Sequence, residues 1–233
     1  MTSSFQVELL GKEMCGEDIL TCRFSRPSGY RFAAGQWFRL TIETAEGADT
    51  RTFSHCSGPD DEYLETTTRL SPSAFKVALS ALEPGAPVTI AGPGGRLALP
   101  PTADRVCFLV GGVGVTPVRS ILRDAAATGR VFDDALLMYG NRDESCVPFA
   151  DEFAGMASVG LRTVVCFEHA SPAWDGERGF ISAETVRRHL DPDDGRPFFV
   201  AGPPVMVGAM ERVLDDLGVG LERRIVERFG PAK

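Results

Sequence analysis

Residues 107–118 read Cys-Phe-Leu-Val-Gly-Gly-Val-Gly-Val-Thr-Pro-Val, and this stretch indicates how the second half of the chain folds. An apolar run breaks into three glycines, which permit left-handed backbone and a close approach to a ligand. A proline follows, at a point where a helix can begin without an amide donor. The free amides of such a helix start favour negative charge. The stretch predicts a buried strand ending in a phosphate-binding turn, although glycines after a strand also form ordinary turns and the spacing is not Gly-x-Gly-x-x-Gly.

Strand-type and helical patterns alternate through the whole segment that contains this stretch. Strands are expected at 105–110, 135–140, 162–167, 197–201 and 224–227, and helices at 116–127, 148–157, 182–190 and 205–217. Such alternation predicts an α/β domain over residues 104–233, with a parallel sheet covered on both faces. In these sheets ligands bind at the carboxyl ends of the strands, where the chain has unusual residues at 111–116, 140–143 and 202–204. We expect one crevice to collect all three.

The residues before the proline-rich boundary at 100–104 show a different pattern. Short β-type segments at 5–10, 19–24, 37–42 and 88–90 are separated by turn residues, with one helical interruption at 73–82. This spacing predicts an antiparallel β-barrel domain over residues 1–100. The chain is therefore expected to have two domains.

Composition excludes several classes of protein. With a net charge of −8 and three lysines among 233 residues, the chain lacks the basic surface that nucleic acids require. No apolar stretch approaches the length of a membrane span, and no signal segment opens the chain, so we expect a cytoplasmic protein that binds no membrane. Its six cysteines are widely spread, with no pattern that could hold a metal or an iron–sulfur cluster. They are expected to be reduced thiols, mostly in the core.

Two polar segments of the first half could carry chemistry. Arg51-Thr52-Phe53-Ser54 is expected to open a strand, with Arg51 and Phe53 on one face and Thr52 and Ser54 on the other. Taken alone, these residues favour an edge strand with a solvated arginine. Arg69 to Lys76 places hydroxyls at the start of a helix, where Ser73 could be a simple N-cap or part of a phosphate site.

The order of these motifs along the chain resembles the ferredoxin–NADP reductase family of flavoproteins, from Gly35-Gln36-Trp37 to Glu227-Arg228-Phe229. The resemblance implies a flavin-binding barrel followed by an NAD(P)-binding domain, with FAD as cofactor. It implies that Arg51 neutralises the flavin pyrophosphate, that Phe53 packs on the isoalloxazine ring and that Ser54 lies near flavin N5. The other cofactor-binding residues it implies are Thr52, Arg69, Ser71, Ser73, Ala74, Gly111, Gly112, Gly114, Thr116, Pro117, Gly202, Pro203, Pro204, Met206 and Phe229. Asn141 and Arg142 are further candidates from their place at the end of the second strand, where a solvated loop is the other interpretation.

The chain departs from the family pattern in places. Ala201 stands where a cysteine often precedes Gly-Pro-Pro, and His55-Cys56 follows the flavin motif where small or apolar residues are common. Cys56 fits a buried structural thiol better than a thiol beside the flavin. Glu227 resembles a carboxylate that approaches the nicotinamide in the family, which makes it a catalytic candidate together with Ser54; a surface glutamate ending a strand is the other interpretation.

The resemblance implies hydride transfer from NADH or NADPH to FAD, and then electron transfer to a separate acceptor: an iron–sulfur protein, a ferredoxin, a haem protein or a quinone. One arginine flanked by two acids, in Arg142-Asp143-Glu144, slightly favours NADH. A ferredoxin could dock if Arg23, Arg26, Arg31 and Arg39 form a local basic patch. The alternatives are a free-flavin reductase and a non-catalytic flavin- or nucleotide-binding regulatory subunit. We expect a monomer.

Overall fold

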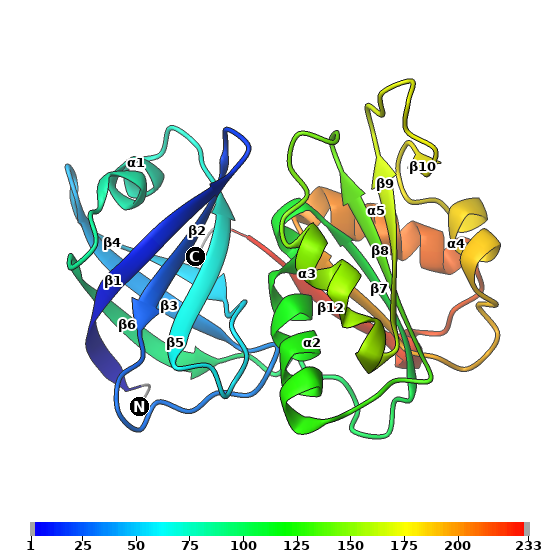
Figure 1. Cartoon of the computed structure of the whole chain (residues 1–233), viewed down its shortest axis with the longest axis horizontal. Helices are drawn as coiled ribbons and strands as arrows, with labels where there is room; N and C mark the ends of the chain where they lie inside the picture. Colours follow the sequence, from blue (N-terminus) through cyan, green and yellow to red (C-terminus); the bar gives the residue numbers. More distant parts are fainter. Residues whose placement is uncertain (1–2, 231–233) are drawn as a thin grey trace. The chain divides into compact units, whose positions relative to one another are not determined.

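The computed structural model of the chain describes residues 3–230. It divides into two compact units, shown in Figure 1. Within the described residues, unit 1 takes the chain up to Ala98 together with Thr116–Asp124. Unit 2 takes Leu99–Val115 and Ala125–Gly230. The long helix that follows the glycine-rich stretch is therefore divided, and its first two turns group with unit 1.

Unit 1 is a curled antiparallel sheet with one helix. Its elements are β1 (Ser4–Cys15), β2 (Ile19–Ser25), β3 (Trp37–Thr44), β4 (Gly47–Ser54), β5 (Tyr63–Arg69), α1 (Ala74–Ala81) and β6 (Pro87–Gly94). The strand order is β4-β3-β6-β1-β2-β5, which leaves β4 and β5 as the two edges. Alternate side chains such as Phe24, Phe38 and Ile90 point inward and are fully buried. The expected antiparallel domain is confirmed.

Unit 2 contains a parallel sheet. Its elements are β7 (Arg105–Gly111), η1 (Gly112–Val115), α2 (Thr116–Thr128), β8 (Asp134–Asn141), α3 (Ala150–Ala154), η2 (Gly155–Val159), β9 (Leu161–Phe167), β10 (Glu177–Arg178), α4 (Ala183–His189), β11 (Phe198–Gly202), α5 (Pro204–Asp216), η3 (Leu221–Arg223) and β12 (Arg224–Arg228), with α2 shared with unit 1. The strand order is β10-β9-β8-β7-β11-β12, and every pair is parallel. Strands buried on both faces explain the continuous apolar runs of β7 and β11.

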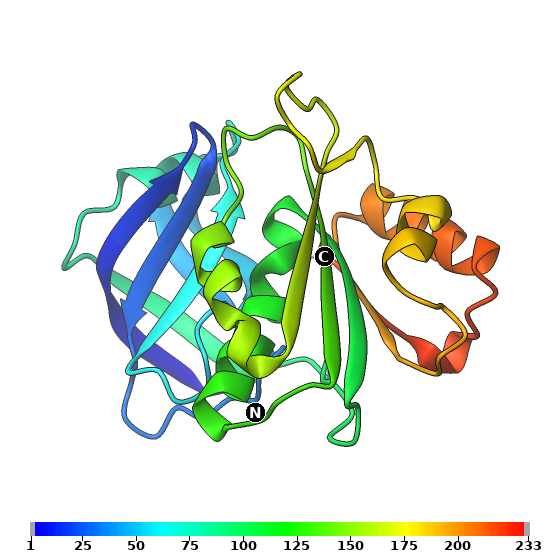
Figure 2. The same ribbon diagram turned by 45° about the vertical axis from the view of Figure 1, so that its right-hand side comes forward.

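Both faces of the parallel sheet are covered. Figure 2 shows α3 on one face and α4 and α5 on the other. On the α3 side, Tyr139 of β8 meets Phe153 edge to face, with ring centroids 6.3 Å apart. On the opposite side, Met138 and Leu109 pack with Val207 and Leu214 of α5. The predicted α/β domain with a doubly covered sheet is confirmed.

The structure corrects several details of the sequence-based expectations. Residues 51–54 close β4 and do not open a strand. The helix expected at 148–157 is a short α-helix followed by a 3-10 helix, and the backbone at Met156 within the latter is non-helical. Strands β5 and β10 were not expected. Four cysteines (Cys22, Cys56, Cys107 and Cys166) are free and buried, but Cys15 and Cys146 are disulfide-bonded, so the expectation of six reduced thiols is wrong. Among the described helices, none is both long and apolar enough to cross a membrane.

Candidate active site

The three unusual turns of unit 2 follow the carboxyl ends of adjacent strands, β8, β7 and β11. Gly111 pairs in register with Gly140, which brings the first two turns side by side. Gly114 lies so close to β11 that a Cβ there would stand 2.3 Å from the carbonyl oxygen of Ala201. The close approach explains why glycine is needed at position 114. Pro117 occupies the first turn of α2, as expected.

Met206 joins the turn after β7 to the turn after β11. Its side chain lies against Gly202, where a Cβ would stand 3.0 Å from Sδ, and against Gly111, where a Cβ would stand 3.6 Å from Cγ. Gly202 has a φ of 154°, which few side-chain-bearing residues adopt. Pro203 and Pro204 lead from it into α5, and both are exposed. These residues form one continuous surface at the carboxyl edge of the sheet.

Glu227 lies on β12 at the same edge, opposite Ala201 of β11. Its Oε2 atom is buried and has no hydrogen-bond partner. Burial raises the pKa of this carboxyl group to about 7. Glu227 is therefore not the solvated glutamate that the sequence left as an alternative. Phe229 follows, and its backbone amide donates to the carbonyl of Gly202 at 2.8 Å, which fixes the end of β12 to the second turn.

The end of β8 carries the polar residues expected to choose between nucleotides. Asn141 is partly buried, and its carbonyl accepts from the amide of Glu168 at 3.0 Å. The Arg142 side chain is 73% exposed and lies 3.7 Å from the Asp143 carboxylate. Asp143 also accepts from the Ser145 amide at 2.9 Å, and Glu144 from the Ser171 amide at 2.8 Å. These hydrogen bonds lower the pKa of both carboxyl groups, so both are ionised at neutral pH.

In unit 1, the four residues expected to bind flavin lie at the end of edge strand β4. Arg51 pairs with Asp49, and its guanidinium carbon lies 5.5 Å from the centroid of the Phe75 ring. Thr52 is exposed, and Ser54 is largely buried. As the alternation predicted, Ser54 and Phe53 lie on opposite faces of the strand.

Phe53 contributes to the core of unit 1. The residue is 8% exposed, and its ring packs against Phe38 and Phe75 with centroids 6.4 and 5.9 Å away. The ammonium group of Lys76 lies 4.5 Å from the Phe53 centroid and donates to the Thr68 hydroxyl. Burial lowers the pKa of Lys76 to about 8. No local pattern predicts this contact, because Lys76 is a single basic residue in a short helix.

Trp37 is a neighbour of Ser54 that the motif analysis missed. The two residues pair directly across β3 and β4, so their side chains share one face of the sheet. Gly94 of β6 pairs with Trp37 on its other side, and a Cβ at Gly94 would stand 2.3 Å from the indole. The indole therefore lies against a glycine on the face of the sheet that it shares with Ser54. Strand register, which no local pattern reveals, creates this arrangement.

The segment from Arg69 to Ala74 leads from β5 into α1. Arg69 pairs with Asp18 on the exposed surface. Ser73 is the N-cap of α1: its hydroxyl accepts from the Lys76 amide at 3.4 Å and lies 3.2 Å from that of Ser71. The N-cap interpretation is thus confirmed. The phosphate-binding interpretation stays a prediction.

The two residues after Ser54 are structural. His55 stacks on Phe32 with centroids 3.8 Å apart, its Nε2 lies 3.2 Å from the Tyr30 hydroxyl, and burial lowers its pKa to about 3. Burial, followed by the nearby Glu65, raises the pKa of Cys56 to about 12. Both side chains are therefore neutral, and Cys56 is the buried structural thiol that the sequence favoured.

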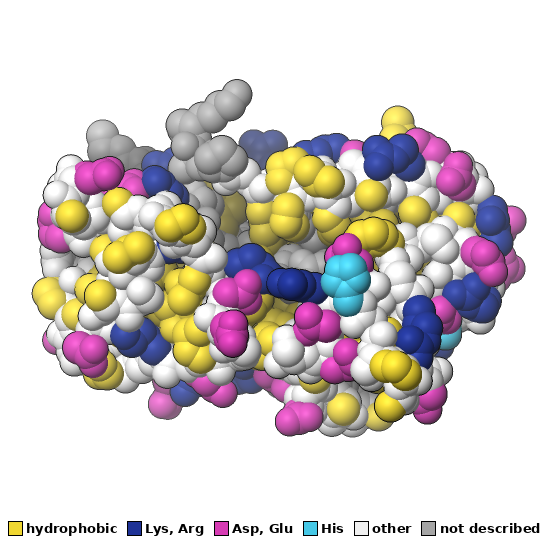
Figure 3. All heavy atoms as spheres, turned by 90° about the horizontal axis from the view of Figure 1, so that it is seen from above, with side chains coloured by type: hydrophobic (Ala, Val, Ile, Leu, Met, Phe, Trp, Pro, Cys, Tyr) yellow, Lys and Arg dark blue, Asp and Glu magenta, His cyan; other side chains and the backbone are white. Residues whose placement is uncertain are grey.

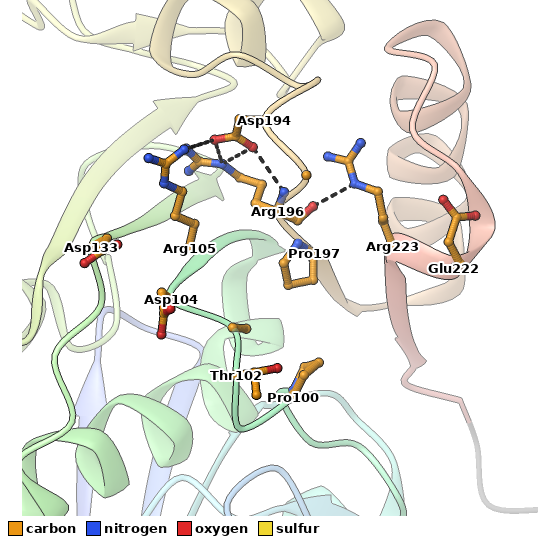
Figure 4. A pocket seen from close by; sticks show the side chains of 12 residues that line it. Pro100, Thr102, Asp104, Arg105, Asp133, Asp194, Arg196, Pro197, Glu222 and Arg223 are labelled. Atoms are coloured by element: carbon orange, nitrogen blue, oxygen red, sulfur yellow. Dashed lines mark hydrogen bonds and ion pairs between the residues drawn. The ribbon is translucent and has the colours of Figure 1, made fainter.

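Unit 2 also has a pocket at the opposite, amino-terminal edge of its sheet (Figure 4), with a volume of about 530 Å³. Asp194 pairs there with Arg105 and Arg196. Arg196 also pairs with Asp134 at 2.8 Å. These charges mainly neutralise one another, and none of the sequence-predicted site residues lines this pocket.

Charged groups are mixed over the described part of the face in Figure 3, where basic and acidic side chains alternate. Of the four arginines considered for a basic patch, Arg23 pairs with Glu65 and Arg26 donates to the carbonyls of Tyr30 and Asp61. Arg31 and Arg39 are exposed. In the described residues, no group of His, Cys, Asp and Glu is arranged to hold a metal ion.

Comparisons with known proteins agree with this architecture. Residues 108–212 match the family model of the oxidoreductase NAD-binding domain. Ferredoxin–NADP reductase B of Sorangium cellulosum is 29% identical over 238 residues, which cover 97% of each chain. A component of the Na⁺-translocating NADH-quinone reductase of Idiomarina loihiensis is 31% identical over 64% of this chain, but only 38% of that component is covered.

Among solved structures, a ferredoxin NADP⁺ reductase from Neisseria gonorrhoeae with bound FAD and NADP has the same fold. Its TM-score is 0.86 at 23% identity, over 97% of this chain and 99% of that chain. The fold, the NAD-binding domain and the similarity along the whole sequence lead to one conclusion. The chain has the two-domain fold of a ferredoxin–NADP reductase and an oxidoreductase NAD-binding domain over residues 108–212, as its sequence indicated.

Proposed function

We propose that this chain is an FAD-dependent NAD(P)H oxidoreductase that passes electrons to a separate acceptor. The observation that carries the proposal is the meeting of Gly111, Gly202 and Glu227 at adjacent strand ends of unit 2. Backbone without side chains suits a dinucleotide pyrophosphate, and the following helix start favours its negative charge. The similarity to a ferredoxin–NADP reductase over 97% of the chain supports the same function.

The residues of unit 2 fit a nicotinamide dinucleotide. The buried Oε2 of Glu227 lacks a hydrogen-bond partner, and a carboxamide is a group that could satisfy it. With a pKa of about 7, Glu227 can carry a proton on Oε2 near neutral pH and donate it in a hydrogen bond, or accept one when ionised. Glu227 would thereby orient the nicotinamide and hold a proton beside it.

The residues of unit 1 fit a flavin around Ser54. Trp37 and Ser54 share one face of the sheet, so an aromatic surface lies beside a hydroxyl. Arg51 is the candidate partner of the pyrophosphate, and the segment Ser71 to Ala74 offers further donors. When bound, FAD accepts two electrons as a hydride equivalent and releases them singly or in pairs. The protein groups hold and orient the rings.

We propose NADH as the preferred donor. The carboxylates of Asp143 and Glu144 are ionised and fixed by backbone amides at the end of β8. Two fixed negative charges repel a ribose 2′-phosphate, and Asp143 competes with it for Arg142. The comparison of kcat/KM for NADH and NADPH tests this proposal, and a strong preference for NADPH would contradict it.

The electron acceptor in this proposal is a separate iron–sulfur protein, ferredoxin, haem protein or quinone. The Na⁺-translocating relative acts on quinone by its name, and other relatives act on ferredoxin or cytochrome b5. We further propose that the chain is a monomeric cytoplasmic protein, which light scattering and cell fractionation would test.

A free-flavin reductase is the second candidate, and the position of Phe53 favours it. With 8% of the residue exposed, Phe53 offers little surface against which a resident flavin could pack. A non-catalytic regulatory protein is the third candidate, but the buried Glu227 beside the glycine turn gives it less support.

One titration separates these functions. The spectrum of the purified full-length protein is recorded without oxygen before and after each addition of NADH. A yellow protein that bleaches supports the resident-FAD reductase. A colourless protein that bleaches added FAD indicates a free-flavin reductase, and a yellow protein that keeps its colour would indicate a non-catalytic regulatory protein.

A further inference from the structure

The curled sheet of unit 1 closes immediately after Ser54. Its two edge strands, β4 and β5, meet there through a few hydrogen bonds rather than a full ladder. The Thr66 hydroxyl donates to the Ser54 carbonyl at 3.0 Å, and the Cys56 amide donates to the Glu65 carbonyl at 2.9 Å. The Glu65 amide donates to the Ser57 hydroxyl at 3.2 Å. These three hydrogen bonds hold the backbone at and just beyond Ser54 to β5.

Arg119 of α2 completes this closure. It belongs to the part of α2 that groups with unit 1, and its side chain is 6% exposed. Its Nη1 donates to the carbonyl of Cys56 at 3.0 Å and pairs with the Glu65 carboxylate. The other carboxylate oxygen of Glu65 accepts from Arg23 at 3.0 Å. Arg119 thus contacts the backbone two residues beyond Ser54 and the side chain that faces it.

Stability alone does not account for this pair. The Arg119 and Glu65 side chains are both nearly fully buried, so the cost of desolvating their two charges offsets most of their attraction. Two apolar residues of similar volume would often stabilise the folded protein equally well. Charged hydrogen bonds are strong and directional. The Arg119 guanidinium and the Glu65 carboxylate therefore hold each other, and the Cys56 carbonyl, in one geometry. A hydroxyl two residues away would be sensitive to that geometry.

We propose that Arg119 is a positioning residue for hydride transfer, which fixes the Ser54 hydroxyl through the Cys56 carbonyl and the Glu65 carboxylate. The inference rests on the proposed role of Ser54 beside the flavin. Arg119 itself contacts neither cofactor in this proposal. Its effect on the rate should therefore depend on the presence of the Ser54 hydroxyl.

Arg123 provides a matched control. It lies one turn further along the same helix and in the same unit, and it forms two 2.9 Å hydrogen bonds with the Asp61 carboxylate. Its side chain is 27% exposed, and its described contacts with Asp61 and Tyr63 lie outside residues 54–57. Arg123→Met removes a similar cation and a similar ion pair from α2 without touching the Ser54 backbone.

The test is a double-mutant cycle on the full-length protein loaded with FAD. The rate of flavin reduction by NADH is followed in a single turnover without oxygen for the wild type, Ser54→Ala, Arg119→Met, the double variant and Arg123→Met. Loss of a catalytic hydrogen bond in Ser54→Ala should slow reduction about 100-fold. Arg119→Met should slow it by about 10-fold or more through misplacement, with no further loss in the double variant.

Arg119→Lys should restore part of the rate of flavin reduction. Arg123→Met should change this rate less than about 2-fold, although the thermal stability of the variant falls. If Arg119→Met does not fold, the variant Glu65→Gln/Arg119→Met replaces it in the cycle, because it removes both buried charges and leaves no buried ion unpaired. Arg23, the other partner of Glu65, is partly exposed.

The outcomes separate the inference from the proposed function. The role of Arg119 would be overturned if the double variant lost rate by the product of the two single losses, or if Arg123→Met lost as much rate as Arg119→Met. Either result would leave the proposed reductase function in place. An unchanged rate in Ser54→Ala would overturn the proposed roles of Ser54 and Arg119, again without contradicting the proposed reductase function. A wild-type protein that NADH does not bleach would overturn the proposed function itself.

Discussion

Trp37 and Ser54 lie directly opposite each other on β3 and β4, with their side chains on the same face of the sheet. This relationship predicts that flavin binding quenches the fluorescence of Trp37, because a flavin held at Ser54 would lie against the indole. Of the two tryptophans, Trp174 lies in unit 2. Titration of flavin-free protein with FAD should therefore quench the emission of Trp174→Phe strongly, and that of Trp37→Phe weakly. The reverse pattern would place the flavin elsewhere.

Glu227 predicts a distinctive dependence of stability on pH. Its folded pKa of about 7 lies above the ordinary value of 4.5, so the folded protein holds a proton that the unfolded chain releases. Stability should therefore fall as pH rises from 4.5 to 7, and remain lower above that range. Glu227→Gln should be more stable than the wild type at pH 8 by on the order of 1 to 3 kcal/mol, and equal to it below pH 4.5.

Urea unfolding at several pH values measures this difference. Glu222→Gln is the control, because it makes the same substitution at an exposed residue just before β12. The same variants can be followed in hydride transfer. Glu227→Gln should lose the ionisation near pH 7 from its rate profile, and an unchanged profile would remove Glu227 from the site.

Gly114 predicts a steric limit at the nucleotide turn. A methyl group there would stand 2.3 Å from the Ala201 carbonyl oxygen, so Gly114→Ala must displace the turn after β7 or the end of β11. We expect a loss of about 2 to 3 kcal/mol of stability and a marked rise in KM for NADH. Gly155→Ala is the matched control, since nothing lies within 4 Å of its added methyl group. Equal behaviour of the two variants would contradict the close approach.

Asp143 predicts a change of donor preference. Asp143→Asn removes a negative charge beside Arg142, so the ratio of kcat/KM for NADPH to that for NADH should rise about 2- to 5-fold at low salt, and less at high salt. Asp133→Asn makes the same charge change just before β8, outside the carboxyl edge, and should leave the ratio unaltered. A ratio that moves equally in both variants would reflect only net charge.

Local patterns predicted most of this fold because apolar periodicity is local. The strand that ends at Gly111 and the helix that begins near Thr116 follow directly from the apolar run and the Gly-to-Pro sequence. By contrast, β5 was missed because Tyr-Leu-Glu-Thr-Thr-Thr-Arg has no alternation of apolar and polar residues. Its threonines are nevertheless buried, since tertiary packing decides their environment.

The candidate site was predicted unevenly for the same reason. Glycine turns and strand-end residues carry their signal within a few positions, so a crevice joining the turns at 111–116, 140–143 and 202–204 was expected. Glu227 was a candidate through the family resemblance alone. Partners joined only by register or by long separation carry no such signal: Trp37 meets Ser54 across two strands, and Arg119 meets Glu65 54 residues earlier in the chain. Such pairs become visible only when the sheet is assembled.

The sparse closure between β4 and β5 links assembly of the barrel to the cofactor. Because the two edges join just beyond Ser54, an opened barrel would lose the proposed flavin site, and a flavin bound there would hold the edges together. Ligand that binds only the closed form stabilises it by mass action. Supply of the vitamin-derived cofactor would therefore set how long the polypeptide survives proteolysis, as well as how fast it turns over.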